Sequence, residues 1–456
     1  MLNVHLRIAD VATARPTPVR VRVSTPDGTQ FPPLDRAETF PAGRNEDVGG
    51  HLWVGREKWW YIDGTCEMPL PAGVPLRVQI AKGLEWTPLD ETVVLGAGQI
   101  SLRFAVSRWA DSRAEGWRTV DTRCHFISPH AALLEARAED LDVVNLLAVP
   151  FPVLALDAHT YTTVPNLLAF SGQVSALERD GGSVTVNTFN THPVLGKVAL
   201  LNSHRPVLPL TFGGTETDDW GVCDWCDQCH RKKGLTVWAD AFEPAGGLQG
   251  GEALVAALLG KIDAIEVTGD ARKTPLLPWV YRLWSAGFRV PLVGASGKDS
   301  NRTVLGSMRT YVRANGESWV EAVRSGYTVA TAGPLLTLTP DGEWFRAAAR
   351  APGAAPTVEL VVNGKVIAVG AGTAEAAVRE NGWVAARCPA QTGFAHTAPV
   401  FIGTPQRAPG AVGALRKLVE QTREWAETHG RFTNPNRKQA LLDRCAEAIV
   451  RLDGQP

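Results

Sequence analysis

The sequence predicts a multidomain protein with an α/β core, a β-sandwich domain on each side of that core, and a helical tail. Three observations support this fold class. Short alternating runs with Gly and Pro turns fill the first part of the chain, apolar strand-like runs alternate with helical ones after Trp117, and strands return before two amphipathic helices. A chain of 456 residues is too long for a single hydrophobic core. The changes of pattern place the domains at residues 1–114, 115–335, 336–405 and 406–456.

The N-terminal domain is predicted from alternating runs at residues 19–23, 76–80, 91–95 and 100–104. The first run is followed by the turn Thr25-Pro26-Asp27-Gly28. Short strands with frequent turns are typical of a small antiparallel sandwich. In the C-terminal domain, Asn363-Gly364 between apolar runs predicts a hairpin. Residues 411–452 contain two amphipathic helices, which we expect to pack onto the body of the protein.

The middle of the chain alternates between strand and helix. It also contains a predicted hairpin formed by residues 183–187 and 197–201. The predicted helices are residues 131–138, 224–233, 251–259, 278–286 and 318–325, and the predicted strands are residues 141–147, 234–238, 262–267 and 290–294. This alternation predicts a parallel α/β sheet or barrel with its site at the C-terminal ends of the strands.

Composition narrows the possible partners. The chain has 46 Lys and Arg against 47 Asp and Glu, a net charge of −1, so no overall basic field favours a nucleic acid or an anionic membrane. No apolar run has the length of a membrane span, and no signal peptide is visible at the N-terminus. Seven cysteines without a framework spacing favour a cytoplasmic protein, and an exported mature form stays open. The oligomeric state is not indicated.

Three cysteines precede a histidine with regular spacing. Cys223, Cys226, Cys229 and His230 form Cys-x-x-Cys-x-x-Cys-His, a pattern that suggests a zinc site. Structural zinc sites usually take ligands from two separate segments, and no second cysteine pair follows. The spacing also suits one face of a helix, which favours packing cysteines.

Residues 116–126, Gly-Trp-Arg-Thr-Val-Asp-Thr-Arg-Cys-His-Phe, are the most informative segment. On a strand, alternate side chains share a face, so Asp121, Arg123 and His125 are expected to point together. Arginine has no lone pair to offer a metal. Of these three side chains, only Asp121 and His125 could therefore ligate a metal.

Further motifs follow this strand. They are Ala138-Glu139-Asp140-Leu141-Asp142-Val143-Val144-Asn145, Gly297-Lys298-Asp299-Ser300-Asn301 and Thr331-Ala332-Gly333-Pro334-Leu335. In this order they resemble the CehA/McbA-like metallohydrolases of the polymerase-and-histidinol-phosphatase (PHP) superfamily, over roughly residues 100–340. The resemblance implies a distorted α/β barrel that gathers two or three Zn, Mn or Fe ions. Those ions would activate water against an ester, carbamate or phosphoester.

We compared each metal-ligand position of the family with the corresponding residue of this sequence, and most of these positions are substituted. The Asp-x-His-x-His strand becomes Asp121-Thr122-Arg123-Cys124-His125, the Thr-Asp-His end becomes Ala148-Val149-Pro150, Gly-x-Glu becomes Gly172-Gln173-Val174, Gly-His becomes Gly196-Lys197, a later His becomes Asp240, and Asp299 is kept. The ligands left by this resemblance are His125, Asp240 and Asp299, with Asp121 as a possible fourth. They could hold one divalent Zn, Mn or Fe ion. A metal-free site also stays open, because Arg123, Lys197 and Lys298 bring positive charge.

Two functions remain in competition. As an enzyme, a single ion on His125, Asp240 and Asp299 would activate water while Arg123 or Lys197 stabilises the oxyanion. As a binding module, the cationic pocket would recognise an anionic small molecule or glycan end without turnover. In the metal-free case we expect the cations to pair with Asp240, Asp299 or the ligand. A purely structural role is the third option.

Overall fold

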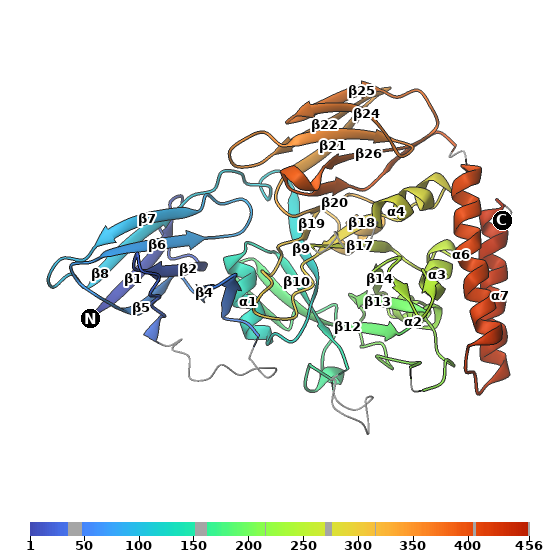
Figure 1. The fold of residues 1–456 in the computed structure, drawn as a ribbon, viewed down its shortest axis with the longest axis horizontal. Helices are drawn as coiled ribbons and strands as arrows, with labels where there is room; N and C mark the ends of the chain where they lie inside the picture. The colour runs from blue at the N-terminus through green and yellow to red at the C-terminus, as the bar shows by residue number, and fades with distance from the viewer. Residues whose placement is uncertain are drawn as a thin grey trace.

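The structure is a computed structural model that describes residues 1–34, 48–150, 162–214, 216–269, 276–314, 316–404 and 407–454. Figure 1 shows two β-rich regions beside a central mixed region, and a pair of long helices at the opposite side from the N-terminus. The central region lies between the N-terminal strands and the two tail helices. The site described below belongs to this central region.

The N-terminal region contains two sheets that share one apolar core. One sheet has the order β5 (Thr65–Leu70), β1 (Leu2–Asp10), β8 (Ser101–Val106); the other has the order β3 (His51–Val54), β4 (Glu57–Ile62), β2 (Val19–Ser24), β6 (Pro75–Ala81), β7 (Leu89–Val94). In β6, Leu76, Val78 and Ile80 are buried and alternate with more exposed residues, which is the pattern of a sheet with one face on a core. The four strands predicted in this region are confirmed.

The central sheet is a single path of strands that continues into the C-terminal region. Its order is β18 (Leu292–Ala295), β17 (Ala264–Thr268), β14 (Leu235–Ala239), β13 (Gly196–Leu201), β12 (Gly182–His192), β10 (Val143–Ala148), β9 (Trp117–Cys124), β19 (Arg309–Arg313), β20 (Thr328–Thr331), β27 (Ala395–Thr397), β26 (Gly382–Cys388), β23 (Thr357–Val362), β24 (Lys365–Ala371). At its sides, β11 (Leu177–Arg179) pairs with β12 and β28 (Val400–Ile402) pairs with β26.

Strand direction in this sheet is mixed, so the expectation of a parallel sheet is corrected. β9, β10 and β12 run parallel, and so do β14, β17 and β18. β12, β13 and β14 are antiparallel neighbours, because only three residues join β12 to β13 and so short a link makes a hairpin. The predicted hairpin is confirmed.

The described strands do not close into a barrel through a continuous ladder. The chain after β18 nevertheless approaches the end of β9. The His125 amide donates to the Lys298 carbonyl at 2.7 Å, and the Gly297 amide donates to the Arg123 carbonyl at 3.1 Å. Gly297 has a φ of +61°, a conformation that glycine adopts without strain. The open sheet is therefore curved enough to bring the C-terminal ends of β9 and β18 together.

Helices cover the central sheet. They are α1 (Pro129–Ala138), α2 (Val222–Arg231), α3 (Gly251–Leu258), α4 (Leu276–Ser285) and α5 (Trp319–Arg324). The tail helices are α6 (Pro409–Thr428) and α7 (Pro435–Leu452). Two short 3₁₀ turns, Leu167–Ala169 and Ala390–Thr392, and a small hairpin of β15 (Pro244–Ala245) and β16 (Leu248–Gln249) complete the described elements. As predicted, the tail packs onto the body, where α6 and α7 contact α3 (Figure 1). No described helix combines the length and the apolar character needed to cross a bilayer.

The cysteines of α2 have a packing role. Cys223, Cys226 and Cys229 are buried in the largest apolar cluster, and burial raises the pKa of each thiol above its ordinary value. The neighbouring His230 instead pairs with Asp263, at 2.9 Å between Nε2 and Oδ2. The prediction of helical packing cysteines is confirmed.

The C-terminal region places a three-stranded sheet, with β22 (Trp344–Arg350) between β21 (Leu335–Asp341) and β25 (Thr373–Ala377), beside the end of the long sheet. Apolar side chains from both sheets form one cluster. The predicted hairpin is confirmed: Asn363 and Gly364 join β23 to β24, both with positive φ, at +48° and +84°.

Candidate functional site

A cavity of about 620 Å³ opens at the C-terminal ends of the central strands. Its described lining residues are Arg123, His125, Phe126, Val149, Pro150, Phe189, Thr191, His192, Pro193, Lys197, Thr211, Gly213, Gly214, Glu216, Asp240 and Asp299. Five of the segments compared with the metallohydrolases therefore meet in one place, although they lie far apart in the sequence. This is the strand end at which α/β proteins usually bind their ligands.

Arg123 lies at the centre of this cavity's ion-pair network. Its Nη2 lies 2.7 Å from Oε1 of Glu266 and 3.4 Å from Oδ1 of Asp240, and its Nε lies 3.0 Å from both oxygens of Glu266. The guanidinium also lies 5.1 Å from the ring centre of Phe189. The side chain is 11% exposed. A buried guanidinium is stable only with partners of this kind, because its desolvation is costly.

Lys197 completes the network from β13. Its Nζ lies 2.7 Å from Oδ2 of Asp240, so the two oxygens of Asp240 face different cations. Burial would raise the pKa of Asp240, but Arg123 and Lys197 outweigh it and hold the pKa below the usual value. The expected pairing with Asp240 is confirmed for Arg123 and Lys197, whereas Lys298 pairs with Glu135 instead. The two cations and two carboxylates form a cluster that we call the Arg123 network: Arg123, Lys197, Asp240 and Glu266.

Glu266 is the member of this network that the sequence analysis missed. It lies on β17, where Ile265 and Val267 point into the largest apolar cluster and Glu266 points to the other face. Its side chain is fully buried; burial raises its pKa, and the contact with Arg123 opposes the rise. A single carboxylate inside an apolar run was the available signal, since buried charges are rarely found without a partner.

His125 keeps one ring nitrogen for the cavity. Its Nδ1 lies 3.2 Å from the carbonyl oxygen of Leu147, an acceptor, so Nδ1 carries the proton. Within the described residues no bond reaches Nε2, although the residue is only 5% exposed. Burial, with a smaller effect of Arg123, lowers the pKa of His125 to about 4, so the ring is neutral at neutral pH. The ring packs against Phe189, with 5.2 Å between ring centres.

Two predicted site residues lie away from the cavity. Asp121 is fully buried, and its carboxylate accepts the amides of Ser296 and Gly306 at 3.0 and 2.8 Å. Burial raises its pKa. Lys298 is also fully buried; its Nζ donates to the carbonyl of Thr303 at 2.9 Å and lies 3.3 Å from Glu135. Asp121 therefore supports the loop behind the site, and Lys298 does not reach the cavity.

The cavity is not cationic, which corrects the expected charge. Two cations, Arg123 and Lys197, are balanced by Asp240 and Glu266, and Lys298 lies elsewhere. Asp299, on the rim, is exposed and forms no ion pair or hydrogen bond with another described residue, so it adds a negative charge. The anion-binding hypothesis depended on an excess of positive charge that the described wall does not have.

A second histidine, His192, lies in the cavity wall and is fully engaged by the protein. Its Nδ1 accepts the amides of Val194 and Leu195 at 3.2 and 3.1 Å, and its Nε2 lies 3.1 Å from Oδ1 of Asp218. Asp218 also accepts the amide of Arg431, at the turn between the tail helices, at 2.6 Å. His192 thus anchors the wall and the tail rather than offering a free nitrogen to a ligand.

The residues at this site do not fit a metal ion. Both oxygens of Asp240 already face cations, Asp121 accepts backbone amides, and Asp299 lies on the rim. Across the described ranges, no group of three or more His, Cys, Asp or Glu side chains is arranged to hold a metal. Val149 and Pro150, compared above with the Thr-Asp-His segment of the metallohydrolases, line the cavity without a side-chain ligand atom. Gln173 lies at a separate hollow near the opposite strand ends.

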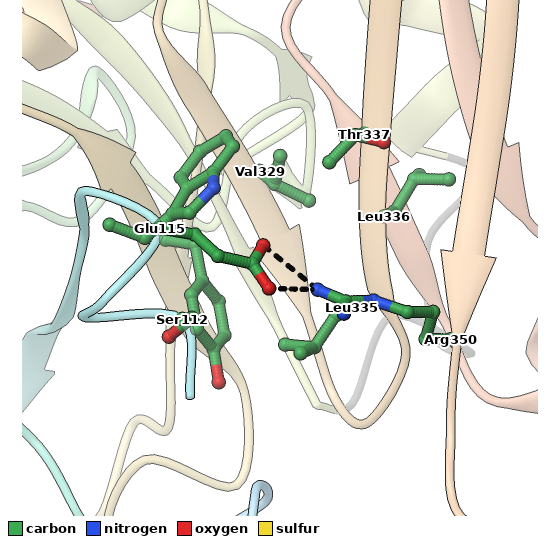
Figure 2. A pocket seen from close by; sticks show the side chains of 9 residues that line it. Ser112, Glu115, Val329, Leu335, Leu336, Thr337 and Arg350 are labelled. Atoms are coloured by element: carbon green, nitrogen blue, oxygen red, sulfur yellow. Dashed lines mark hydrogen bonds and ion pairs between the residues drawn. The ribbon is translucent and has the colours of Figure 1, made fainter. Parts of the chain in front are cut away.

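A smaller hollow of about 20 Å³ lies where the central and C-terminal regions meet (Figure 2). It has room for about one water molecule. Figure 2 shows Glu115 and Arg350 paired across it, with both carboxylate oxygens of Glu115 directed at the guanidinium. Tyr311, in its wall, donates its hydroxyl to Glu85 at 2.9 Å. This hollow is a feature of the seam between regions and is too small for an organic ligand.

Comparison with known proteins gives little further guidance. No family model matches the chain, and no curated protein matches it. One solved structure, the lesion-specific endonuclease PfuEndoQ from Pyrococcus furiosus, is similar at 12% sequence identity and a TM-score of 0.29, over 74% of this chain and 91% of that one. A TM-score this low does not establish a shared fold or activity. The case for function therefore depends on the site itself.

Proposed function

We propose that this protein is a PHP-type, hydrolase-like protein in which an ion-pair network has replaced the metal cluster, so that the cavity binds a small molecule without metal-dependent turnover. The observation that carries the proposal is the position of Arg123, clamped between Glu266 and Asp240 where a metal-binding histidine would stand. Lys197 occupies a second such position and pairs with the same Asp240. The relation to the CehA/McbA-like family is part of the proposal.

The chemistry of the network supports a metal-free state. A divalent ion entering the cavity would have to displace Lys197 and Arg123 from Asp240 to gain a carboxylate ligand. That would leave Arg123 with one partner fewer in a buried position, which costs free energy. A hydrolase with one ion on His125, Asp240 and Asp299 is the second candidate, favoured by the free Nε2 of His125. It has less support because Asp240 is already neutralised.

Metal analysis of protein purified without chelator tests the proposal. We expect no stoichiometric zinc, manganese or iron in the wild type. The variant Arg123→His/Lys197→His restores imidazoles at the two altered positions and should gain zinc affinity, measured by titration calorimetry, because imidazole and carboxylate ligands suit zinc. Arg103→His/Lys417→His is the matched control, since both residues are exposed and lie outside the cavity.

Two results would contradict the proposal. A stoichiometric metal in the wild type that is lost in His125→Ala/Asp299→Ala would support the single-ion hydrolase and contradict the proposal. Hydrolysis of a test ester that stops on chelation would do the same.

A further inference from the structure

The cavity has three polar groups that the protein leaves without a partner. Within the described residues, no bond reaches Nε2 of His125, Nη1 of Arg123 or the carboxylate of Asp299. His125 lines the cavity and is only 5% exposed, so a ligand in the cavity can reach this nitrogen where bulk water has little access. Polar atoms left without a protein partner in a cavity wall are candidates for contacts to a ligand.

One side of this set offers donors. Nη1 of Arg123 is unused, and Nζ of Lys197 has donor capacity beyond its bond to Asp240, with 39% of the Lys197 side chain exposed. Guanidinium and ammonium groups together suit a carboxylate, since their hydrogen bonds to it are charge-assisted. A ligand carboxylate can therefore bind while Asp240 and Glu266 keep their places.

The other side offers acceptors. Nε2 of His125 and the exposed carboxylate of Asp299 both require a donor on the ligand. An ammonium group meets this requirement and also compensates the charge of Asp299. Phe126, which is 41% exposed, adds apolar surface for the rest of the ligand.

Net charge decides between ligand classes. Arg123 and Lys197 contribute +2, and Asp240, Glu266 and Asp299 contribute −3, so these five groups sum to −1. A phosphate or a second carboxylate would increase the repulsion. A molecule with one carboxylate and one ammonium adds no net charge and satisfies both sides.

Resting on the proposed metal-free binding function, we infer that the cavity takes an amino-acid-type zwitterion: its carboxylate lies on Arg123 and Lys197, and its ammonium lies on Asp299 and Nε2 of His125. The volume of about 620 Å³ lies within the range of small-molecule sites, so the ligand can carry a sizeable side chain.

The test is a thermal-shift screen of the full chain with free L-amino acids, followed by titration calorimetry on those that stabilise it. Each amino acid is compared with its N-acetyl derivative, which lacks the ammonium charge, and its amide, which lacks the carboxylate. At least one free amino acid should raise the melting temperature, and its two derivatives should not.

Variants locate the contact. Asp299→Asn should weaken binding by about tenfold, since one charged hydrogen bond is lost. Lys197→Met should weaken it by a similar factor. Asp341→Asn, at an exposed aspartate on β21, is the matched control and should bind as the wild type does.

Two outcomes separate this inference from the function on which it depends. Stabilisation by sugar acids or phosphates, with none by free amino acids, would overturn the zwitterion and keep a metal-free binding site. Binding of an amino acid only in the presence of added zinc or manganese would contradict the metal-free function itself. If no free amino acid stabilises the protein, the inference is wrong.

Discussion

Two buried ion clusters in this protein differ in whether they lie beside a cavity. The first joins the N-terminal region to the core around Asp140, whose Oδ1 accepts Nη2 of Arg108 at 2.9 Å and Nη1 of Arg113 at 2.6 Å. Its Oδ2 accepts the indole N–H of Trp86 at 2.9 Å. Burial would raise the pKa of Asp140, but the two arginines outweigh it and hold the pKa well below the usual range.

The second cluster, the Arg123 network, also pairs buried carboxylates with cations, but it leaves Nη1 of Arg123 without a partner among the described residues. Glu266 is even more buried than Asp140, yet beside it Nη1 of Arg123 and Nε2 of His125 open onto a cavity. In the first cluster, which we call the seam cluster (Asp140, Arg108, Arg113 and Trp86), both carboxylate oxygens of Asp140 have partners, and the cluster joins the N-terminal region to the core. Buried charge alone therefore does not indicate a binding site; donors and acceptors without a protein partner beside a cavity do.

Removal of the central cation separates the two clusters most strongly. Arg123→Ala leaves Glu266 buried without a cation on it, and we expect a loss of about 3–5 kcal/mol in the free energy of unfolding. Urea denaturation measures it. Arg123→Met/Glu266→Leu, which removes both charges, should recover most of the loss. A cost below about 1 kcal/mol for Arg123→Ala would mean that Glu266 is protonated or solvated.

A change of pH sharpens the comparison through two buried histidines. His125 faces the cavity, whereas both ring nitrogens of His396 have protein partners. Its Nε2 lies 2.7 Å from the hydroxyl of Tyr281, and its Nδ1 lies 2.7 Å from the carbonyl oxygen of Thr397. Burial lowers the pKa of each to about 4, below the ordinary value of 6.5. The unfolded state then binds more protons between pH 6.5 and 4. The contribution of these histidines to stability is full above pH 6.5 and is lost on acidification, by about 2 kcal/mol per histidine at pH 5.

Denaturation at pH 7 and pH 5 tests this in the wild type, His125→Gln and His396→Gln. Each variant should lose about half of the histidine contribution to the pH dependence. A ligand that bonds to Nε2 of His125 should steepen the dependence in the wild type and leave it unchanged in His125→Gln. An identical pH dependence in all three proteins would contradict the assigned burial.

The seam cluster should tolerate the loss of one cation better than the site does. Arg108→Ala leaves Arg113 on Asp140, so we expect a cost of about 1–2 kcal/mol, the size of a hydrogen bond to a charged group. The variant also loses the packing of Arg108 on Trp86, 4.4 Å from the ring centre. A cost equal to that of Arg123→Ala would remove the distinction between the clusters.

The smallest effect on stability is expected at the rim. Asp299→Asn changes an exposed side chain with no hydrogen bond to another described residue, so the free energy of unfolding should change by less than about 0.5 kcal/mol. Thermal and urea denaturation both measure it. A larger loss would place Asp299 in the structural framework and remove it from the ligand-binding wall.

Much of the fold and part of the site could be predicted from the sequence. Hydrophobic periodicity predicted the strands and helices of the core. The family resemblance singled out Arg123, Lys197, Asp240 and Asp299, and these four residues line one cavity. The hairpin of β12 and β13 was predicted, but the sheet as a whole was expected to be parallel, because the alternation of strands and helices around that hairpin suggested parallel neighbours.

The errors at the site have physical causes. Glu266 was missed because a carboxylate in an apolar strand has no spacing that names its partner. Lys298 was expected beside Asp299 at the site, but adjacent residues on extended chain point to opposite sides. Its Nζ therefore enters the buried layer beside Glu135 while Asp299 remains on the rim. Without Lys298 and with Glu266, the net charge of the site changes sign.

A crystal structure from crystals grown with zinc and manganese, with anomalous data collected at each metal edge, tests whether the Arg123 network excludes a metal. We expect Arg123 between Glu266 and Asp240 and no anomalous peak in the cavity. A peak bounded by His125, Asp240 and Glu266, with the Arg123 side chain turned outward, would contradict it.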